Sequence, residues 1–490
     1  MIKYKGKVLT EEQENHILTI TNNNNDFAIQ APPGSGKTFL LLALARKMSG
    51  YGLSISFNKL LAVEANKKFC SSVMAKTGHA LAYGAVGHKY KDRLRKLTGK
   101  HLADILDIGN WQLYNGPANK GYLILSTIRK YCYSADKIIS KKHLPKLTLL
   151  NEGNIELMQE DLIKQTAKVF GKMSDLSSDL PITHDVYLKI WALTNPIIRK
   201  DYIFFDEYQD SNPVISNIIK SQDCQKIFVG DQFQQIYSWR GAVNALQDES
   251  LNTLNITKSF RFGDAIADVA NKIIINYYPY NFPYIPFYGN DDVFSTVSYE
   301  PTDVDCIICR TNRGVIAETI RMLEQNYSVH ILGGAQSLTY LINSIHHLKT
   351  KGYSNHPELF LFKSYIDLRE YANSPMGGDI KPVLKLIENY TREGLLNILE
   401  STIEDADNAD VTITTAHKAK GLEWPIVRLA NDFKVPTDDS TPTSEETNIL
   451  YVAASRALQH LDLSGCMACN PNSMELARVL NKRKFEEQES

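Results

Sequence analysis

The chain has 490 residues, 43% hydrophobic and 22% charged, the composition of an ordinary globular protein with room for two or more domains. Its formal net charge of −1 gives no global basic field, so any nucleic-acid site must be local. The N-terminal stretch holds no apolar signal core, and no run approaches the ~18 apolar residues of a membrane span. We therefore expect no membrane contact and a cytoplasmic location, bacterial or in a virus-infected host, with the nucleus left open.

The first informative stretch in chain order is IQAPPGSGKT, residues 29–38, where an apolar strand precedes a glycine-rich turn and a helix. Inward-pointing N–H groups and a helix N-terminus together form an anion site. Lys37 would reach the β- and γ-phosphates of a nucleotide, and the Thr38 hydroxyl would bind Mg²⁺. Because Ala31 stands where the strict phosphate-loop pattern has glycine, a simple glycine-rich turn remains an alternative. The candidate nucleotide-binding residues are Gly34, Ser35, Gly36, Lys37 and Thr38.

Further along, DYIFFDEYQD at residues 201–210 has the form of an apolar strand that ends in acids. Asp206 at the strand end would hold Mg²⁺ through water, and Glu207 could act as the general base on the attacking water. A core strand followed by a solvated acidic turn is the alternative. Together with the phosphate loop, this pair predicts ATP hydrolysis with ATP and Mg²⁺ as cofactors.

Strand-like runs alternate with helical periodicity along the chain, which predicts an α/β fold with parallel sheets. The runs fall into two groups, before about residue 250 and after about residue 300, so we expect two parallel-sheet cores. Residues 86–196 and 335–408 are helix-patterned insertions, one in each core. The first insertion has 17 Lys and Arg against 11 Asp and Glu, densest in HKYKDRLRKLTGKH, which is either a nucleic-acid surface or a solvated helix face. The strand-like runs are FAIQA, GLSISF, YIFFDE, KIFVGD, DCIICR, SVHILGG, DVTITTAH and HLDLSG.

The seven cysteines include two C-x-x-C pairs, Cys306/Cys309 and Cys466/Cys469, the spacing of zinc half-sites. In a strand, however, residues three apart face opposite sides, so one zinc ion could not easily use both thiols of DCIICR. We therefore predict core thiols and no metal site beyond Mg²⁺.

VGDQFQQIYSWRGA, residues 229–242, resembles motif III of the UvrD/Rep-like DNA helicases of superfamily 1. Other stretches resemble further motifs in the family's order: LTEEQ the Q motif, SFNKLLAVEANKKF and KTGHALAY motifs Ia and Ib, and ITKSFRF motif IV. TTAHKAKGLEWPIV and EETNILYVAASRA are similar to motifs V and VI. The FNK of motif Ia and LPITHDVYLKIWAL, residues 180–193, look like the F-box DNA helicase branch. We do not expect that branch's ubiquitin-ligase role, because no F-box-like region precedes the motor.

The resemblance implies two RecA-like cores with ATP between them. It implies that Gln13 reads the adenine, Phe260 stacks on it and Glu423 contacts the ribose. The groups it places at the γ-phosphate are Gln234, Arg261 and Arg456, the last as arginine finger.

Single-stranded nucleic acid would cross both cores on the opposite edge. The rings of Tyr237 and Trp239 project on one side of an extended segment, where they could stack on bases without reading sequence; the alternative is a pair of core aromatics. The positions that correspond to DNA contacts in the family are Phe57, Asn58, His79, Tyr237, Trp239, Arg240 and His417.

The sequence thus predicts an ATP-dependent helicase that moves 3′→5′ on single-stranded DNA and acts at single-strand/duplex junctions, the direction resting on the resemblance alone. Two alternatives stay open: an ATPase subunit that remodels a partner, such as a nuclease complex or recombinase filament, and an RNA motor. We expect the tail 481–490 to be frayed. The predicted domains are core 1 at 1–85 and 197–255, its insertion at 86–196, core 2 at 256–334 and 409–480, and its reduced insertion at 335–408.

Overall fold

The computed structural model divides into two compact units. Unit 1 comprises residues 1–31, 36–232 and 237–256, and unit 2 comprises residues 32–35, 233–236 and 257–490. The residues described are 3–4, 7–95, 97–109, 114, 117–145, 155–237, 246, 250–354, 356, 359, 362, 364–373, 381–438 and 440–489.

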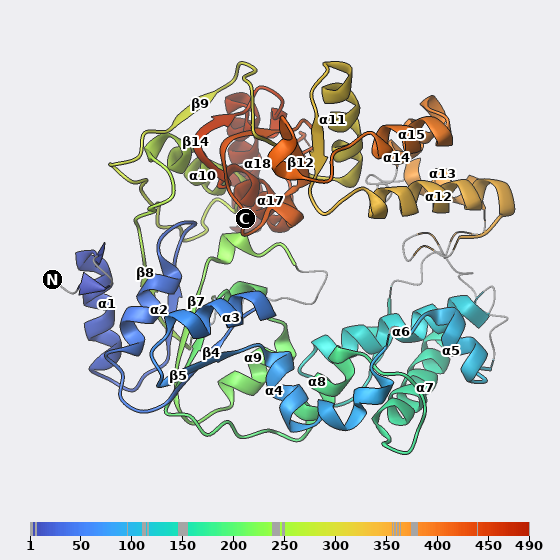
Figure 1. Cartoon of the computed structure of the whole chain (residues 1–490), viewed down its shortest axis with the longest axis horizontal. Helices are drawn as coiled ribbons and strands as arrows, with labels where there is room; N and C mark the ends of the chain where they lie inside the picture. Colours follow the sequence, from blue (N-terminus) through green and yellow to red (C-terminus); the bar gives the residue numbers. More distant parts are fainter. Residues whose placement is uncertain are drawn as a thin grey trace. The chain divides into compact units, whose positions relative to one another are not determined.

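Unit 1 is built on a six-stranded parallel sheet in the order β5-β4-β6-β7-β3-β8 (Figure 1). Alternate residues of β3 face opposite sides: Phe27 and Ile29 pack in one core cluster, and Ala28 packs in another. Both faces are therefore covered, as parallel sheets require. The strands are β3 Phe27–Gln30, β4 Gly52–Ile55, β5 Val73–Lys76, β6 Tyr202–Phe205, β7 Gln225–Gly230 and β8 Asn252–Asn255.

The helices of unit 1 begin at residues suited to capping. Thr10 and Gln13 form a capping box at the start of α1, and the Asn212 side chain accepts from the Ile215 N–H at the start of α9. The α-helices are α1 Glu11–Thr21, α2 Lys37–Ala45, α3 Lys59–Lys68, α4 Gly78–Ala85, α5 Gly99–Ile105, α6 Pro117–Tyr133, α7 Ile155–Ser174, α8 His184–Leu193 and α9 Pro213–Lys220. The 3₁₀ turns are η1 Gly87–Arg93, η3 Lys141–His143, η5 Tyr208–Asp210 and η6 Gln232–Gln234, and a short hairpin pairs β1 Lys3–Tyr4 with β2 Lys7–Val8.

Unit 2 holds a second six-stranded parallel sheet, in the order β11-β12-β10-β13-β14-β9. Its strands are β9 Thr296–Ser298, β10 Cys306–Cys309, β11 Val329–Ile331, β12 Val411–Thr415, β13 Trp424–Leu429 and β14 Ala457–Asp462. Its α-helices are α10 Asp264–Tyr277, α11 Asn312–Glu324, α12 Gln336–Lys351, α13 Tyr365–Asn373, α14 Lys381–Asn389, α15 Arg392–Glu400, α16 Ala416–Ala419, α17 Ser444–Ala454 and α18 Pro471–Glu489, with 3₁₀ turns η9 Ala406–Asn408 and η10 Met467–Cys469.

These two sheets confirm the predicted α/β fold class with two parallel-sheet cores. All eight strand-like runs lie on strands. The four thiols of the C-x-x-C pairs are buried, as predicted for core cysteines. In the part of the chain that the structure describes, no helix combines the length and apolarity needed to cross a bilayer.

The prediction of a frayed tail is wrong, because α18 continues to Glu489. The helix is anchored along one side. The Asn481 amide donates to the backbone carbonyls of Asn276 and Tyr278 at 3.2 and 3.0 Å, and the ring of Phe485 lies 6.2 Å from that of Tyr280. The sequence NKRKFEEQES has mixed charges, but Asn481 and Phe485 are four residues apart and therefore lie on the same face of the helix.

Candidate nucleotide and nucleic-acid site

The phosphate loop connects β3 to α2 and has the backbone that an anion site requires. Gly34 and Gly36 have φ values of 72° and 80°, a region that residues with a side chain rarely adopt. Ala31, which departs from the strict pattern, is fully buried; its N–H donates to the Gly230 carbonyl at 2.8 Å. The Ala31 carbonyl accepts from Lys37 Nζ at 3.0 Å, so the ammonium lies over the loop where a phosphate would sit. Alanine at this position is therefore compatible with the loop.

Asp206 follows β6 and faces the start of α2. Burial and the neighbouring Glu207 raise the pKa of the Asp206 carboxyl above its ordinary value, against the opposing effects of Lys37 and a hydrogen bond from the Thr38 hydroxyl. A divalent cation would favour the charged carboxylate at neutral pH. Thr38 and Asp206, the two predicted Mg²⁺ ligands, thus lie in contact, and their oxygen donors suit this cation.

Glu207 is held in the left-handed conformation, with a φ of 52°, which is uncommon for a residue of this type. Its carboxylate accepts from the Gln209 amide at 2.5 Å. The Gln209 carbonyl oxygen in turn accepts from the Asp231 N–H at 3.0 Å, and the Asp231 carboxylate accepts from the Gln30 amide at 3.0 Å. These ties between the ends of β3, β6 and β7 aim the predicted general base. Gln209 and Asp231 were not predicted from the sequence, although Gln209 stands two residues after Glu207 and Asp231 directly follows β7.

A small cavity of unit 1 opens onto Thr38, Asp206 and Glu207. Phe57, a predicted DNA contact, lines the same cavity, and Asn58 caps α3 by accepting from the Leu61 N–H at 2.9 Å. The remaining lining residues are Leu41, Ser54, Ser56, Leu61, Glu64, Ala65, Lys68 and Phe69.

In unit 2, three of the four residues predicted to act on the γ-phosphate and ribose form one cluster: Arg261, Glu423 and Arg456. The fourth, Gln234, is buried, and its backbone carbonyl accepts from Lys420 Nζ. Arg261 Nε lies 2.6 Å from the Glu423 carboxylate, and its Nη1 donates to the Ser455 carbonyl at 3.1 Å. Arg456 donates from Nη2 to the Ser455 hydroxyl at 2.9 Å and from Nε to the Val452 carbonyl at 2.9 Å. Three motifs far apart in the sequence are therefore brought together, with Ser455 between the two arginines.

The candidate adenine contacts lie in both units. Phe260 is 42% exposed, so its ring face is open to a stacking partner, while its N–H donates to the Gly34 carbonyl at 2.8 Å. A Cβ on Gly34 would lie 2.3 Å from Arg261 Cβ, so glycine is required here by close approach. Gln13 is buried on α1, and its side-chain oxygen accepts from the Thr10 N–H at 3.2 Å.

The predicted nucleic-acid contacts divide into three groups. Tyr237 stacks on Phe57 with ring centroids 5.8 Å apart and planes 12° apart. His79 pairs with Asp185 of α8 at 3.1 Å, and His417 Nε2 lies 3.1 Å from the Ile236 carbonyl oxygen; burial and Arg310 lower the pKa of His417. Trp239 and Arg240 lie outside the described residues.

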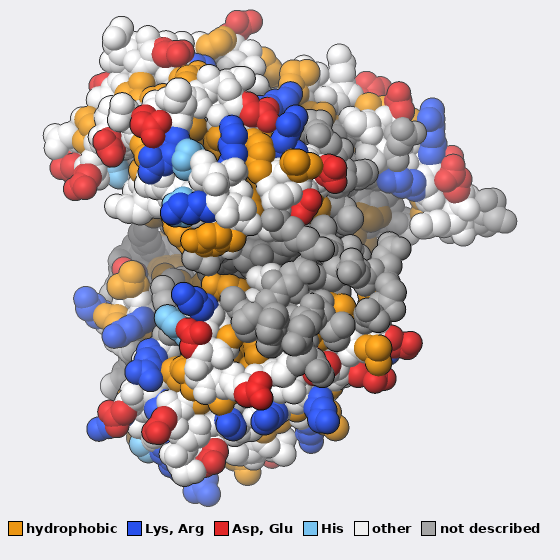
Figure 2. All heavy atoms as spheres, turned by 90° about the vertical axis from the view of Figure 1, so that its right-hand side faces the viewer, with side chains coloured by type: hydrophobic (Ala, Val, Ile, Leu, Met, Phe, Trp, Pro, Cys, Tyr) orange, Lys and Arg blue, Asp and Glu red, His pale blue; other side chains and the backbone are white. Residues whose placement is uncertain are grey.

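The basic run of the first insertion is not uniformly a solvated surface. Arg93 donates from Nε to the Leu180 carbonyl at 2.9 Å and from Nη1 to the Asp175 carbonyl at 2.7 Å, so it holds the chain that follows α7. Lys89, Lys91 and Arg95 are exposed. On the face shown in Figure 2, acidic and basic side chains are interspersed rather than gathered into one patch. Only part of the run is therefore available to a polyanion.

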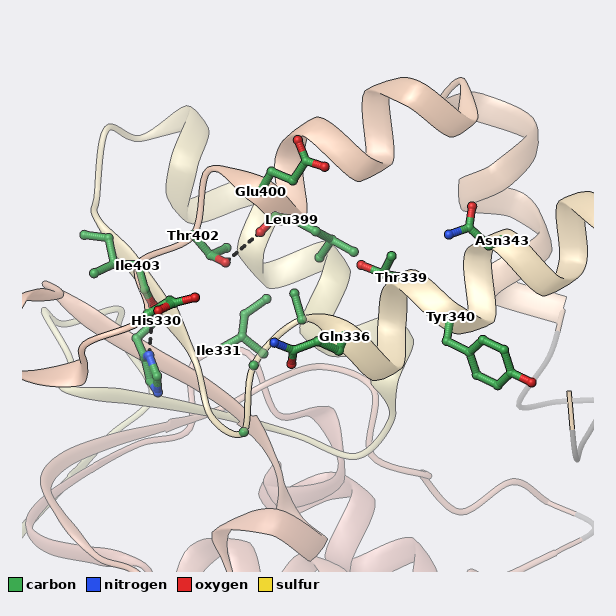
Figure 3. Close-up of a pocket in the computed structure, with 14 residues that line it drawn as sticks. His330, Ile331, Gln336, Thr339, Tyr340, Asn343, Leu399, Glu400, Thr402 and Ile403 are labelled. Carbon is green, nitrogen blue, oxygen red and sulfur yellow. Dashed lines mark hydrogen bonds between the residues drawn. The ribbon is translucent and has the colours of Figure 1, made fainter. Parts of the chain in front are cut away.

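A groove in unit 2 was not anticipated from the sequence. It begins at the loop after β11, where Gly333 and Gly334 have φ values of 79° and 75°, and continues between α12 and the end of α15 (Figure 3). The Lys418 ammonium donates to the Leu332 carbonyl at 3.1 Å, which ties this loop to α16 beside His417. The polar side chains on its α12 wall are Gln336, Thr339, Tyr340 and Asn343.

Comparisons with known proteins match both units. Residues 192–253 match the UvrD/REP helicase N-terminal domain family, and residues 319–468 match the UvrD-like helicase C-terminal domain family. F-box DNA helicase protein 1 of Schizosaccharomyces pombe is 29% identical over 94% of this chain and 57% of that protein. F-box DNA helicase 1 of Gallus gallus is 28% identical over 93% of this chain and 49% of its own length. The ATP-dependent DNA helicase Rep of Buchnera aphidicola is 30% identical over 38% of this chain and 28% of that protein.

Segments of the chain therefore match the N-terminal and the C-terminal domain families of UvrD/Rep-type helicases. The two relatives that match over 94% and 93% of this chain are F-box DNA helicases, which confirms the resemblance to that branch. The chain spans about half the length of these two relatives. A solved arterivirus helicase, non-structural protein 10 with DNA, aligns over 96% of this chain and 65% of its own at 12% identity, with a TM-score of only 0.34.

Proposed function

We propose that this chain is an ATP- and Mg²⁺-dependent DNA motor that translocates 3′→5′ on single strands and unwinds duplexes at single-strand junctions. The observation that carries the proposal is the convergence of Lys37, Thr38 and Asp206 in unit 1. Lys37 and the Thr38 hydroxyl lie at the N-terminus of α2 and face the partly buried Asp206. This arrangement suits a nucleoside triphosphate with its cation. The domain matches and the F-box helicase relatives support DNA as the track.

In this proposal each group has a chemical task. The ammonium of Lys37 neutralises phosphate charge, and Glu207, aimed by Gln209, accepts a proton from the attacking water. Arg261 and Arg456 stabilise charge on the transferred phosphoryl group, with Glu423 released from Arg261 to contact the ribose. Mg²⁺, when bound, would be held by Thr38 and Asp206 and would supply positive charge to the phosphates. A partner such as a nuclease or recombinase, and a role in repair, recombination or replication, fit the same motor.

The test is strand displacement on tailed duplexes, with 3′ or 5′ overhangs, made of DNA or RNA. We expect displacement only of the 3′-tailed DNA, and only with Mg²⁺ and ATP. Lys37→Ala should lose ATP hydrolysis and unwinding by about 100-fold or more while single-strand binding stays within about twofold, because the lysine touches phosphate and not the strand.

Each other outcome contradicts a part of the proposal. Near-parental hydrolysis by Lys37→Ala would refute the phosphate-loop assignment. DNA-stimulated hydrolysis without displacement would identify an ATPase that remodels a partner. Displacement of 5′-tailed substrates would contradict the proposed direction, and displacement of RNA substrates would contradict the preference for DNA.

A further inference from the structure

Four residues of motif III, Phe233–Ile236, leave unit 1 and are seated in unit 2. The residues on either side, up to Gln232 and from Tyr237, belong to unit 1. We call these four residues the strap. Such a short excursion requires specific contacts, because four backbone carbonyl and amide groups must be satisfied away from their own sheet.

Three side chains of unit 2 hold successive backbone carbonyls of the strap. Lys420 Nζ donates to the Gln234 carbonyl at 2.6 Å, and Asn448 Nδ2 donates to the Gln235 carbonyl at 2.9 Å. His417 Nε2 completes the series at the Ile236 carbonyl, 3.1 Å away. Because all three bonds go to the backbone, they fix the path of the strap and leave its side chains to other tasks.

The first residue of the strap fills an aromatic socket. Phe233 is 2% exposed, and its ring lies 5.1 Å from that of Tyr278 and 5.2 Å from that of Tyr284, both edge-to-face. Phe282 and Tyr451 complete the socket at 5.9 Å. Edge-to-face aromatic packing adds directional attraction to the burial of a large ring, so the strap is anchored at its first residue as well as along its backbone.

Asn448 lies in the stretch that is similar to motif VI, where the resemblance assigns a role to Arg456 and none to Asn448. It is 3% exposed on α17, and its side-chain oxygen accepts from the Tyr278 hydroxyl at 2.7 Å. That bond fixes the orientation of the amide, so that Nδ2 faces the Gln235 carbonyl. Tyr278 thus serves the strap twice, through its ring and through its hydroxyl.

Immediately beyond the strap, Tyr237 stacks on Phe57 of unit 1. Adjacent residues are therefore fixed to different units: Ile236 by His417, and Tyr237 by Phe57. If unit 2 moves during turnover, the peptide bond between Ile236 and Tyr237 would carry that movement to the segment that the family resemblance assigns to DNA.

We propose that Asn448, oriented by Tyr278, is a positioning residue that seats the strap on unit 2 and so transmits the state of the nucleotide site to the strand. The transmission to the strand rests on the motor function proposed above. The seating of the strap on unit 2 does not depend on that function. The two parts can therefore fail separately.

The test compares Asn448→Asp with Asn271→Asp in the full chain. Asn271 is a matched control, because its buried amide donates to the Phe287 carbonyl at 2.8 Å, which lies outside the strap. Its side-chain oxygen accepts from the hydroxyl of Tyr284, a residue of the Phe233 socket, and aspartate keeps that acceptor. A carboxylate cannot donate to the Gln235 carbonyl, so amide hydrogen exchange over residues 233–237 should rise about fivefold or more in Asn448→Asp and stay near parental in Asn271→Asp. Base pairs unwound per ATP hydrolysed should fall by a similar factor, about fivefold, while DNA-stimulated ATPase stays within about twofold.

Tyr278→Phe keeps the ring and removes only the hydroxyl that orients the amide, so it tests the seating if Asn448→Asp fails to fold. It should raise exchange in the strap by a smaller factor. Unchanged exchange in both variants, or an equal rise in Asn271→Asp, would overturn the seating. Raised exchange with ATPase and unwinding lost in proportion would overturn the transmission, as would a parental chain that hydrolyses ATP without unwinding.

Discussion

At the scale of the residue, Lys189 is a buried lysine whose hydrogen bonds stabilise the fold. It lies buried on α8, where its ammonium donates to the carbonyls of Ser134 and Asp136 at 2.8 and 2.5 Å and stands 4.3 Å from the Tyr131 ring centroid. Burial lowers the pKa of this lysine from 10.5 to about 8. It holds the chain that follows α6 and has no task in the proposed chemistry.

The shifted pKa predicts how stability depends on pH. Below pH 8 the lysine is charged in the folded and unfolded chains, so it adds no slope. Between about pH 8 and 10.5 the folded chain loses its proton first, and the unfolding free energy should rise by up to ~1.4 kcal/mol per pH unit. Urea unfolding at pH 8, 9 and 10 should show this rise in the parental chain and not in Lys189→Met; equal slopes would contradict it.

The residues that motifs name were predictable one by one, while the residues that position them were not. Lys37, Thr38 and Asp206 could be assigned from short patterns, and the structure brings them into contact. Asn448 donates to the Gln235 carbonyl, more than 200 positions away in the sequence, and no local sequence pattern predicts such a contact. The roles assigned by resemblance stay predictions until variants are measured.

At the scale of the element, buried strands with branched residues were predictable, and strands with unusual composition were not. β13 contains Pro425, which ordinarily argues against an interior strand. The sheet accommodates it at a register shift between Trp424 and Ile426. The edge strand β8, with sequence NTLN, has Leu254 as its only hydrophobic residue, so its sequence does not show the pattern of a strand.

The exposed residues of the basic run in the first insertion predict that the affinity for single-stranded DNA depends on salt. Arg93 is left unchanged because it donates to backbone carbonyls of the insertion. The triple variant Lys89→Glu, Lys91→Glu and Arg95→Glu should bind single-stranded DNA with a weaker dependence on salt. Each lost phosphate contact reduces the slope of log affinity against log salt by ~0.7, so three lost contacts should reduce it by about 2. Fluorescence anisotropy from about 50 to about 300 mM salt would measure this change in slope. The melting temperature should be unchanged, since all three side chains are exposed.

The matched control reverses Lys164, Lys168 and Lys172, exposed residues of α7 in the same insertion. It changes the net charge by the same amount at another place. Equal flattening by both triple variants would mean a general charge effect and no defined DNA surface along the run.

At the scale of the whole molecule, the chain passes repeatedly between its two units. Pro32–Ser35 of the phosphate loop and the strap both cluster with unit 2, although the residues around them belong to unit 1. The segments predicted to bind the nucleotide and the strand thus contain points at which the chain passes from one unit to the other.

Trp239 is where a motor and a simple ATPase should differ. If its ring holds a base, Trp239→Ala should lose unwinding disproportionately, retain most DNA-stimulated ATPase at saturating DNA, and bind single strands ~1–3 kcal/mol more weakly. If the ring is a core aromatic, truncation would cost ~3–5 kcal/mol of stability. A melting curve beside the two activity assays separates these outcomes, and proportional loss of all activities with a lowered melting temperature would remove Trp239 from the strand path.

The distribution of thiols has a practical consequence. Cys132, Cys306, Cys309, Cys466 and Cys469 are buried, whereas Cys70 and Cys224, both in unit 1, are partly accessible. Unit 2 therefore offers no accessible native thiol among its described residues. After Cys224→Ser, a fluorophore pair on Cys70 and on a cysteine placed at the exposed Tyr340 would report the distance between the two units through an ATP cycle, without touching the five buried cysteines.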